Sequence, residues 1–75
     1  MTIKQRGQST MNAMTSEVLP TMGLAYLVDE HSRTWAVTRQ DTGEDFNALE
    51  PGKPVRITVT HYDKFSLVDH CETLN

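Results

Sequence analysis

The last third of the chain carries the pattern that most restricts its fold. Two runs rich in β-branched and apolar residues lie on either side of a short polar break at Asp63 and Lys64. In the first run Val55, Ile57 and Val59 alternate with polar residues, so their side chains project from one face of an extended strand. The pattern predicts a β-hairpin.

The register of this hairpin has two solutions in the sequence. A two-residue loop pairs Val59 with Val68, whereas a three-residue loop pairs Val59 with Leu67. No Asn-Gly or Asp-Gly pair marks the turn and selects one of them. Both registers therefore stay open at this point.

Further short strands are predicted upstream of the hairpin. Residues 23–28 form a compact apolar run that a polar turn follows, and residues 34–39 alternate in the manner of a strand. Residues 46–49 form at most a short third strand between the turn around Gly43 and the proline-rich connection at 50–54. Five short strands with tight turns favour an all-β fold, a small five-stranded antiparallel barrel.

The N-terminal segment has a different composition. Residues 1–20 are polar and predict a flexible tail, which leaves residues 21–75 as the barrel domain. Met11, Met14 and Val18 lie at helical spacing, so a short docked helix is the alternative. An isolated helix of about ten residues is marginal in water, which favours the tail.

Size and composition exclude several classes of protein. A chain of 75 residues allows one domain with a modest core, and oligomerisation would be a natural way to bury more surface. No apolar run approaches the length of about 20 residues that a membrane span requires. The one cysteine, Cys71, cannot form an internal disulfide, so a reducing, cytoplasmic location is expected.

The charge of the predicted barrel is acidic. Residues 21–75 hold five Lys and Arg against nine Asp and Glu, a net charge of −4. Phosphate binding relies on clustered cations, so this balance disfavours a nucleic-acid partner.

From Gly23 to about residue 70, the order of landmarks resembles a cold-shock domain, a small nucleic-acid-binding barrel of the OB-fold type. Gly23 falls on that family's opening glycine, Val37 on the buried end of its second strand, and residues 49–57 on the entry to its fourth strand. The resemblance implies an OB-like barrel. An SH3-like barrel is equally compatible with the strand count.

The same resemblance says little for nucleic-acid binding. The positions on which that family stacks bases correspond here to Leu27, Thr34, Ala36, Phe46 and Ala48, and only Phe46 is aromatic. Each base–aromatic stack contributes about 1–3 kcal/mol, so most of the affinity would be missing. A remaining nucleic-acid patch would combine the cations and aromatics Arg33, Trp35, Arg39, Phe46 and Arg56.

The largest aromatic, Trp35, is more naturally a core residue in so short a chain. Tyr62 and Phe65, in contrast, flank the predicted hairpin tip and are candidates for an exposed binding anchor. Acidic residues in the loops are candidates for contact with a basic partner: Asp41, Glu44 and Asp45.

No catalytic or metal signature accompanies these candidates. Asp69, His70 and Cys71 are consecutive, and neighbours in a strand point to opposite faces, so they do not form a chelating group. We therefore expect neither an enzyme nor a bound metal or cofactor.

The sequence thus predicts a non-catalytic protein-interaction module, a regulator or inhibitor of a larger cytoplasmic complex with an unidentified protein partner. The alternative is a degenerate cold-shock-like protein that binds single-stranded RNA or DNA. A homo-oligomer remains open, and no membrane is expected as a partner.

Overall fold

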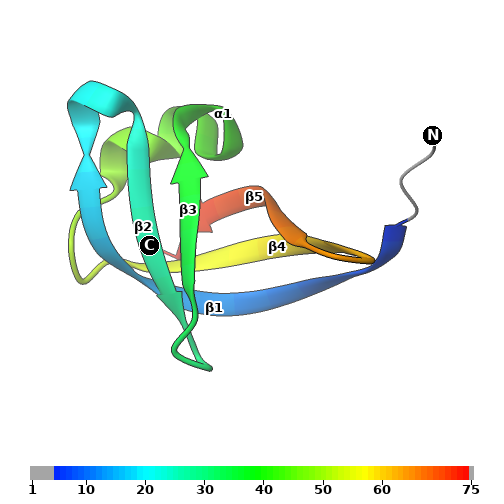
Figure 1. Ribbon diagram of the computed structural model, residues 1–75. Helices are drawn as coiled ribbons and strands as arrows, with labels where there is room; N and C mark the ends of the chain where they lie inside the picture. Colours follow the sequence, from blue (N-terminus) through cyan, green and yellow to red (C-terminus); the bar gives the residue numbers. More distant parts are fainter. Residues whose placement is uncertain (1–4, 75) are drawn as a thin grey trace.

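Five antiparallel strands curl into a half-barrel in the computed structural model, which describes residues 5–74 (Figure 1). The strand order across the sheet is β3-β2-β1-β4-β5, and every ladder is antiparallel. The predicted all-β class is confirmed. The strands are β1 (Gln5–Leu19), β2 (Leu24–Asp29), β3 (Thr34–Thr38), β4 (Pro54–Tyr62) and β5 (Ser66–Thr73).

The expected tail over residues 1–20 is wrong for residues 5–19, which form the central strand β1. β1 pairs with β4 from Gln5 to Met14 and with β2 from Ala13 to Leu19. The helical alternative is wrong for the same reason. Residues 1–4 lie outside the described residues.

A β-bulge explains the misleading spacing in this segment. The register between β1 and β2 shifts between Thr15 and Glu17, so Ser16 is an extra residue that reverses which side chains face inward. Met11 and Val18 both pack against the core, although an uninterrupted strand would turn them to opposite faces. Met11 and Val18 thus imitate helical spacing, although Met14 between them faces outward and is 48% exposed.

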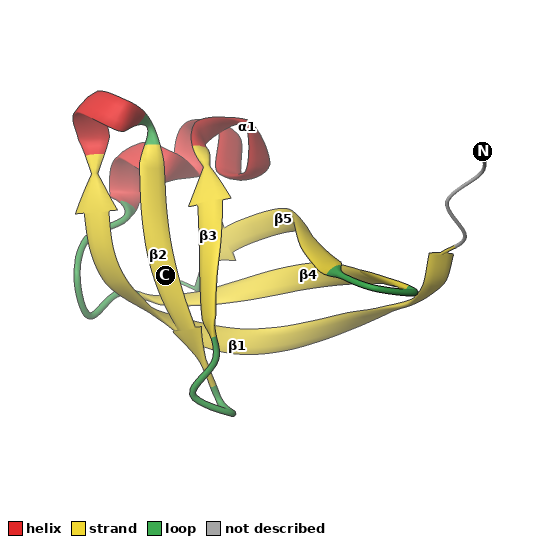
Figure 2. Ribbon diagram, viewed as in Figure 1, coloured by secondary structure: helices red, strands yellow, loops and turns green. Residues whose placement is uncertain are grey.

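Helical turns replace the short strand expected at residues 46–49, which is also wrong (Figure 2). A short α1 (Arg39–Thr42) continues into the 3-10 helix η2 (Gly43–Ala48), and a second 3-10 turn, η1 (Pro20–Met22), links β1 to β2. The Asp41 side chain accepts hydrogen bonds from the Thr38 backbone N–H (2.9 Å) and hydroxyl (3.2 Å), which fixes where the chain leaves β3.

The β4–β5 hairpin has the register of a two-residue loop. Val59 pairs with Val68, and the Tyr62 N–H donates to the Phe65 carbonyl at 2.8 Å. The predicted alternation in β4 is confirmed, because Val55, Ile57 and Val59 are all fully buried. The core comprises these three and Ala13, Ala25, Leu27, Val37, Phe46, Leu49, Val68 and Cys71.

Strands also lie close to the two segments predicted upstream of the hairpin. Residues 23–28 correspond to β2 and residues 34–39 to β3. Among the described residues, no helix is long and apolar enough to cross a membrane.

A chain that begins at Met14 should not fold cooperatively, because it lacks nearly all of the β1 residues that pair with β4. The hairpin β4–β5 would then be a two-stranded sheet, which is marginal in water. Urea denaturation followed by far-ultraviolet circular dichroism measures this. A sigmoidal transition close to that of the full chain would contradict the central role of β1.

Candidate functional site: the tip of the β4–β5 arm

A three-stranded arm projects from the half-barrel. It consists of residues 5–11 of β1, 57–62 of β4 and 66–70 of β5, and it extends beyond the part of β1 that pairs with β2 (Figure 1). Because a third strand backs the hairpin, its end is held more firmly than that of an isolated two-stranded ribbon.

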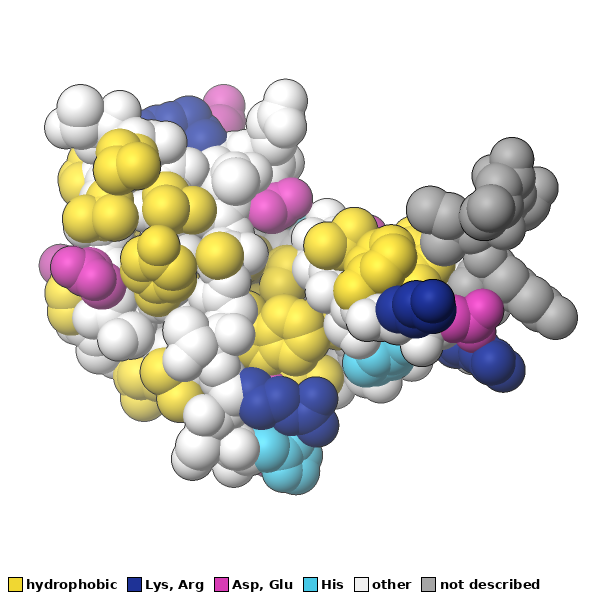
Figure 3. All heavy atoms as spheres, in the orientation of Figure 1, with side chains coloured by type: hydrophobic (Ala, Val, Ile, Leu, Met, Phe, Trp, Pro, Cys, Tyr) yellow, Lys and Arg dark blue, Asp and Glu magenta, His cyan; other side chains and the backbone are white. Residues whose placement is uncertain are grey.

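The end of the arm carries two stacked aromatic rings. The ring centroids of Tyr62 and Phe65 are 4.9 Å apart with an interplanar angle of 28°. Phe65 is 45% exposed, and Leu67 beside it is 53% exposed. Figure 3 shows hydrophobic side chains gathered on the arm, with basic side chains near its end. The sequence therefore located a real aromatic pair at this tip.

An ion pair braces the tip against β1. Arg6 donates to the Asp63 carboxylate, and both side chains are largely exposed. Exposed pairs contribute little stability on average, so the main effect is to hold the loop next to the strand. Lys64, the other loop residue, is exposed, so the tip combines aromatic and charged groups.

Side-chain hydrogen bonds tie the three strands of the arm together. The two ring nitrogens of His61 lie 2.9 Å from the Ser9 hydroxyl and 2.8 Å from the Ser66 hydroxyl. On the opposite face Gln8 donates to the Thr60 hydroxyl at 3.1 Å. These half-buried polar pairs support the arm and do not require a ligand.

Two of the three acidic candidates are engaged inside the fold. Asp41 accepts hydrogen bonds from Thr38, and Asp45 accepts one from the Thr73 N–H at 3.4 Å. Only Glu44 is exposed without a hydrogen bond or ion pair among the described residues. Asp41 and Asp45 therefore accept hydrogen bonds at strand ends within the fold.

The candidate nucleic-acid residues do not form one surface. The Arg39 guanidinium lies 4.4 Å from the centroid of the Phe46 ring, which is only 2% exposed and thus closed to base stacking. Arg56 lies on the outer face of β4, where it is 4.0 Å from Glu72. Arg33 lies on the β2–β3 turn.

Trp35 has one side in the core and one side exposed. It packs partly buried against the core, and its indole N–H donates to the Asp29 carboxylate at 2.8 Å. The same carboxylate accepts the backbone N–H of His31 (2.7 Å) and Arg33 (3.0 Å). These bonds, that from Trp35 foremost, hold the pKa of Asp29 below its ordinary value although burial acts in the opposite direction.

The cysteine is not arranged for chemistry. Burial raises the pKa of Cys71 to about 11, and the carboxylates of Asp41, Asp45 and Glu72 act in the same direction. The thiol is therefore protonated at neutral pH and is a poor nucleophile or metal ligand. Within residues 5–74 no group of three or more His, Cys, Asp or Glu side chains is placed to hold a metal ion.

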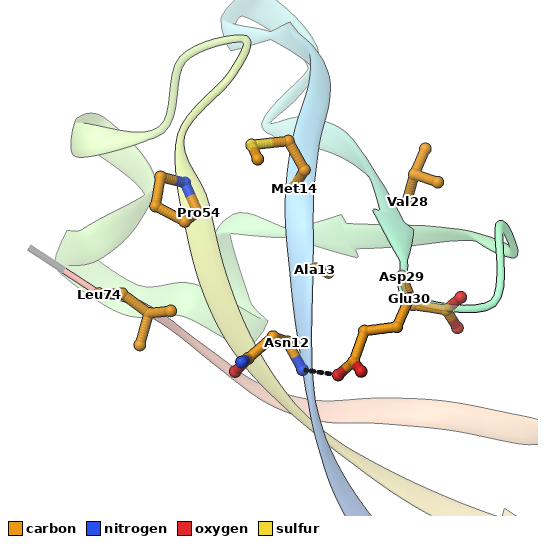
Figure 4. A pocket seen from close by; sticks show the side chains of 8 residues that line it. All are labelled: Asn12, Ala13, Met14, Val28, Asp29, Glu30, Pro54 and Leu74. Carbon is orange, nitrogen blue, oxygen red and sulfur yellow. Dashed lines mark hydrogen bonds between the residues drawn. The ribbon is translucent and has the colours of Figure 1, made fainter.

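A shallow apolar groove lies on the outer face of β1. Figure 4 shows Met14 between Pro54 and Val28, and the register pairs Met14 with both of them. Met14 is 48% exposed, and Leu74 at the other side of the groove is 38% exposed. This groove is a second exposed apolar surface, remote from the tip along β1.

The residues that support the tip were missed in the sequence. Arg6, Gln8 and Ser9 lie in the segment predicted as a tail, and their side chains contact residues more than fifty positions away. No local motif marks such contacts. No family model matches this chain, and neither a curated protein nor a solved structure matches it.

Asp29→Asn should lower the stability of the protein at neutral pH and flatten its acid dependence. A carboxyl group whose pKa is lowered on folding stabilises the fold above its ordinary pKa and loses this contribution as the pH falls through the folded value. Urea midpoints at pH 7 and pH 3, followed by Trp35 fluorescence, measure both effects. If the urea midpoint fell by the same amount from pH 7 to pH 3 in both proteins, Asp29 would not be the source of the acid dependence.

Proposed function

We propose that this chain is a non-catalytic protein-interaction module that binds a protein partner through the tip of its arm. The observation that carries the proposal is the stacked pair of half-buried Tyr62 and exposed Phe65 at the end of a projecting hairpin. Aromatic anchors of this kind dominate the binding energy of protein interfaces.

The rigidity of the tip supports this proposal. Aromatic side chains have few rotatable bonds, and stacking restricts them further, so little entropy is lost when a partner covers them. The two-residue loop and the pairing of the hairpin with β1 restrict the backbone as well. A surface that is ordered before binding retains more of its contact energy as affinity.

The finer proposal is a regulator or inhibitor of a larger cytoplasmic complex. Among residues 5–74 no group of three or more His, Cys, Asp or Glu side chains is placed to hold a metal ion, and the thiol of Cys71 is buried and protonated. A rigid apolar tip would instead act by filling a pocket on a larger protein. Modules of this type bind through a few residues, with a polar rim around them.

A second candidate is a single-strand nucleic-acid binder. The strand order β3-β2-β1-β4 is that of a Greek key, the topology of OB-type barrels, and Trp35 is half-exposed near the Arg33 turn. The acidic balance and the separation of the arginines count against it. This candidate therefore ranks second.

Replacing both tip aromatics with alanine, Tyr62→Ala/Phe65→Ala, should abolish capture of the partner from lysate while the fold persists. Loss of the stack between the two rings should reduce the free energy of unfolding by about 1 kcal/mol. The matched control is Met14→Ala/Leu74→Ala, which removes similar apolar surface from the groove. If only the control loses the partner, the groove and not the tip is the binding surface.

Titration with short single-stranded RNA and DNA separates the two candidates. We expect no saturable change in Trp35 fluorescence at low or at physiological salt, because the cations are dispersed. Saturable quenching that weakens with salt would instead support the second candidate. The tip variant Tyr62→Ala/Phe65→Ala, titrated in parallel, shows whether such binding involves the stacked pair.

A further inference from the structure

The outer edge of β3 has a defined set of backbone groups. At the two ends of the strand, the backbone bonds toward β2: the Arg33 carbonyl accepts from the Asp29 N–H (2.9 Å), and the Arg39 N–H donates to the Gly23 carbonyl (3.0 Å). Alternate residues of an antiparallel strand direct their N–H and C=O groups to opposite sides. The odd-numbered residues of β3 therefore face β2, and the even-numbered residues face the open edge.

Two of these even-numbered residues have no backbone partner. Thr38 is capped by Asp41, but no hydrogen bond reaches the backbone groups of Thr34 or Ala36 on that side among the described residues. Both residues are exposed. Four hydrogen-bonding groups of the strand are thus available to an additional strand.

The opposite edge of the sheet is protected by its own residues, whereas β3 is protected only by being short and by the approach of β5 to part of it. On β5 a bulge at Asp69 interrupts the edge, and the Thr73 N–H is capped by Asp45. Bulges, charges and prolines are the usual protection of edge strands. The β3 sequence Thr-Trp-Ala-Val-Thr contains none of these.

We propose that the β3 edge accepts an extended segment of a partner protein, which adds a strand antiparallel to β3 at Thr34 and Ala36. The inference rests on the proposed function as an interaction module, but it uses a surface separate from the tip. Strand addition of this kind derives affinity from main-chain hydrogen bonds and specificity from side chains at alternate positions. An apolar side chain of the added strand would cover the exposed part of Trp35.

The charge at this edge selects the occupant. Arg33 is exposed at one end of the edge, which favours a segment with an acidic residue opposite it. At the other end the Arg39 guanidinium bonds to Asn47 and the Pro20 carbonyl. The Asp41 carboxylate caps Thr38 there, so this end does not favour a second acidic residue. A two-fold pairing of β3 centred on Ala36 would set Arg33 of one copy opposite Arg39 of the other, and like charges directly opposite each other destabilise a strand pair. A pairing centred on Trp35 avoids this contact, so self-association of the edge is an outcome that the test separates from peptide binding.

The test uses a synthetic peptide, acetyl-Thr-Thr-Val-Thr-Val-Thr-Glu-amide, whose Glu lies opposite Arg33, and the full-length protein labelled with nitrogen-15. Binding should shift the amide signals of Thr34 and Ala36 and slow their hydrogen exchange. It should also change Trp35 fluorescence. The same peptide with Lys in place of Glu should bind more weakly.

Charge reversal provides the matched pair of variants. Arg33→Glu should lower the affinity for the acidic peptide about three- to fivefold, the size expected of an exposed ion pair, and raise the affinity for the basic peptide. Arg56→Glu changes the net charge equally on the outer face of β4 and should leave both affinities unchanged. Ala36→Pro removes an edge N–H that the β2 ladder does not use, so the fold should persist while binding is lost.

Several results would overturn the inference. The first is that the peptide does not shift the amide signals of Thr34 and Ala36. The second is that Arg33→Glu and Arg56→Glu change the peptide affinities equally. The third is that hydrogen exchange at the edge slows with protein concentration in the absence of peptide, which would indicate a dimer. None of them affects capture through Tyr62 and Phe65, so failure at the edge leaves the tip proposal standing. Conversely, if the Tyr62→Ala/Phe65→Ala variant still captured the partner, the tip proposal would fail while the peptide result at the β3 edge would stand.

Discussion

The double pairing of β1 is the constraint on which the rest of this structure depends. Residues 5–14 pair with β4 and residues 13–19 pair with β2, so one strand joins the β2–β3 hairpin to the β4–β5 hairpin. The bulge at Ser16 lets the strand bend and twist between these two partners. Without β1 the two hairpins would not be connected in one sheet, and the core residues that they share would be open to solvent between them.

The length of β1 and the strand order account for the two candidate surfaces. β1 is longer than its β2 partner, and its surplus at residues 5–11 supports the arm and braces the aromatic tip through Arg6. The hairpin β2–β3, left beside the other half of β1, ends the sheet in a short edge strand. The projecting tip therefore follows from the length of β1, and the free edge of β3 follows from its place at the end of the strand order.

The turn between β3 and β4 closes one end of the half-barrel and also accounts for the acidic loops. Phe46 and Leu49 fill the core from η2 and the residues after it, while Asp41 and Asp45 satisfy backbone N–H groups at the ends of β3 and β5. A carboxylate that accepts a backbone hydrogen bond is partly removed from any partner's reach. Two of the acidic residues of the chain, Asp41 and Asp45, therefore stabilise strand ends.

By itself the sequence determined the all-β class, the inward face of β4 and the aromatic pair at the hairpin tip, because each depends on alternation or adjacency within a few residues. Only the tertiary structure decided the role of residues 5–19 and the absence of a strand at 46–49. In β1 a bulge reverses the alternation at Ser16 and several inward positions hold small or polar side chains, so no period-two signal survives. The brace at Arg6 and the free edge of β3 depend on contacts between distant segments, which no local pattern encodes.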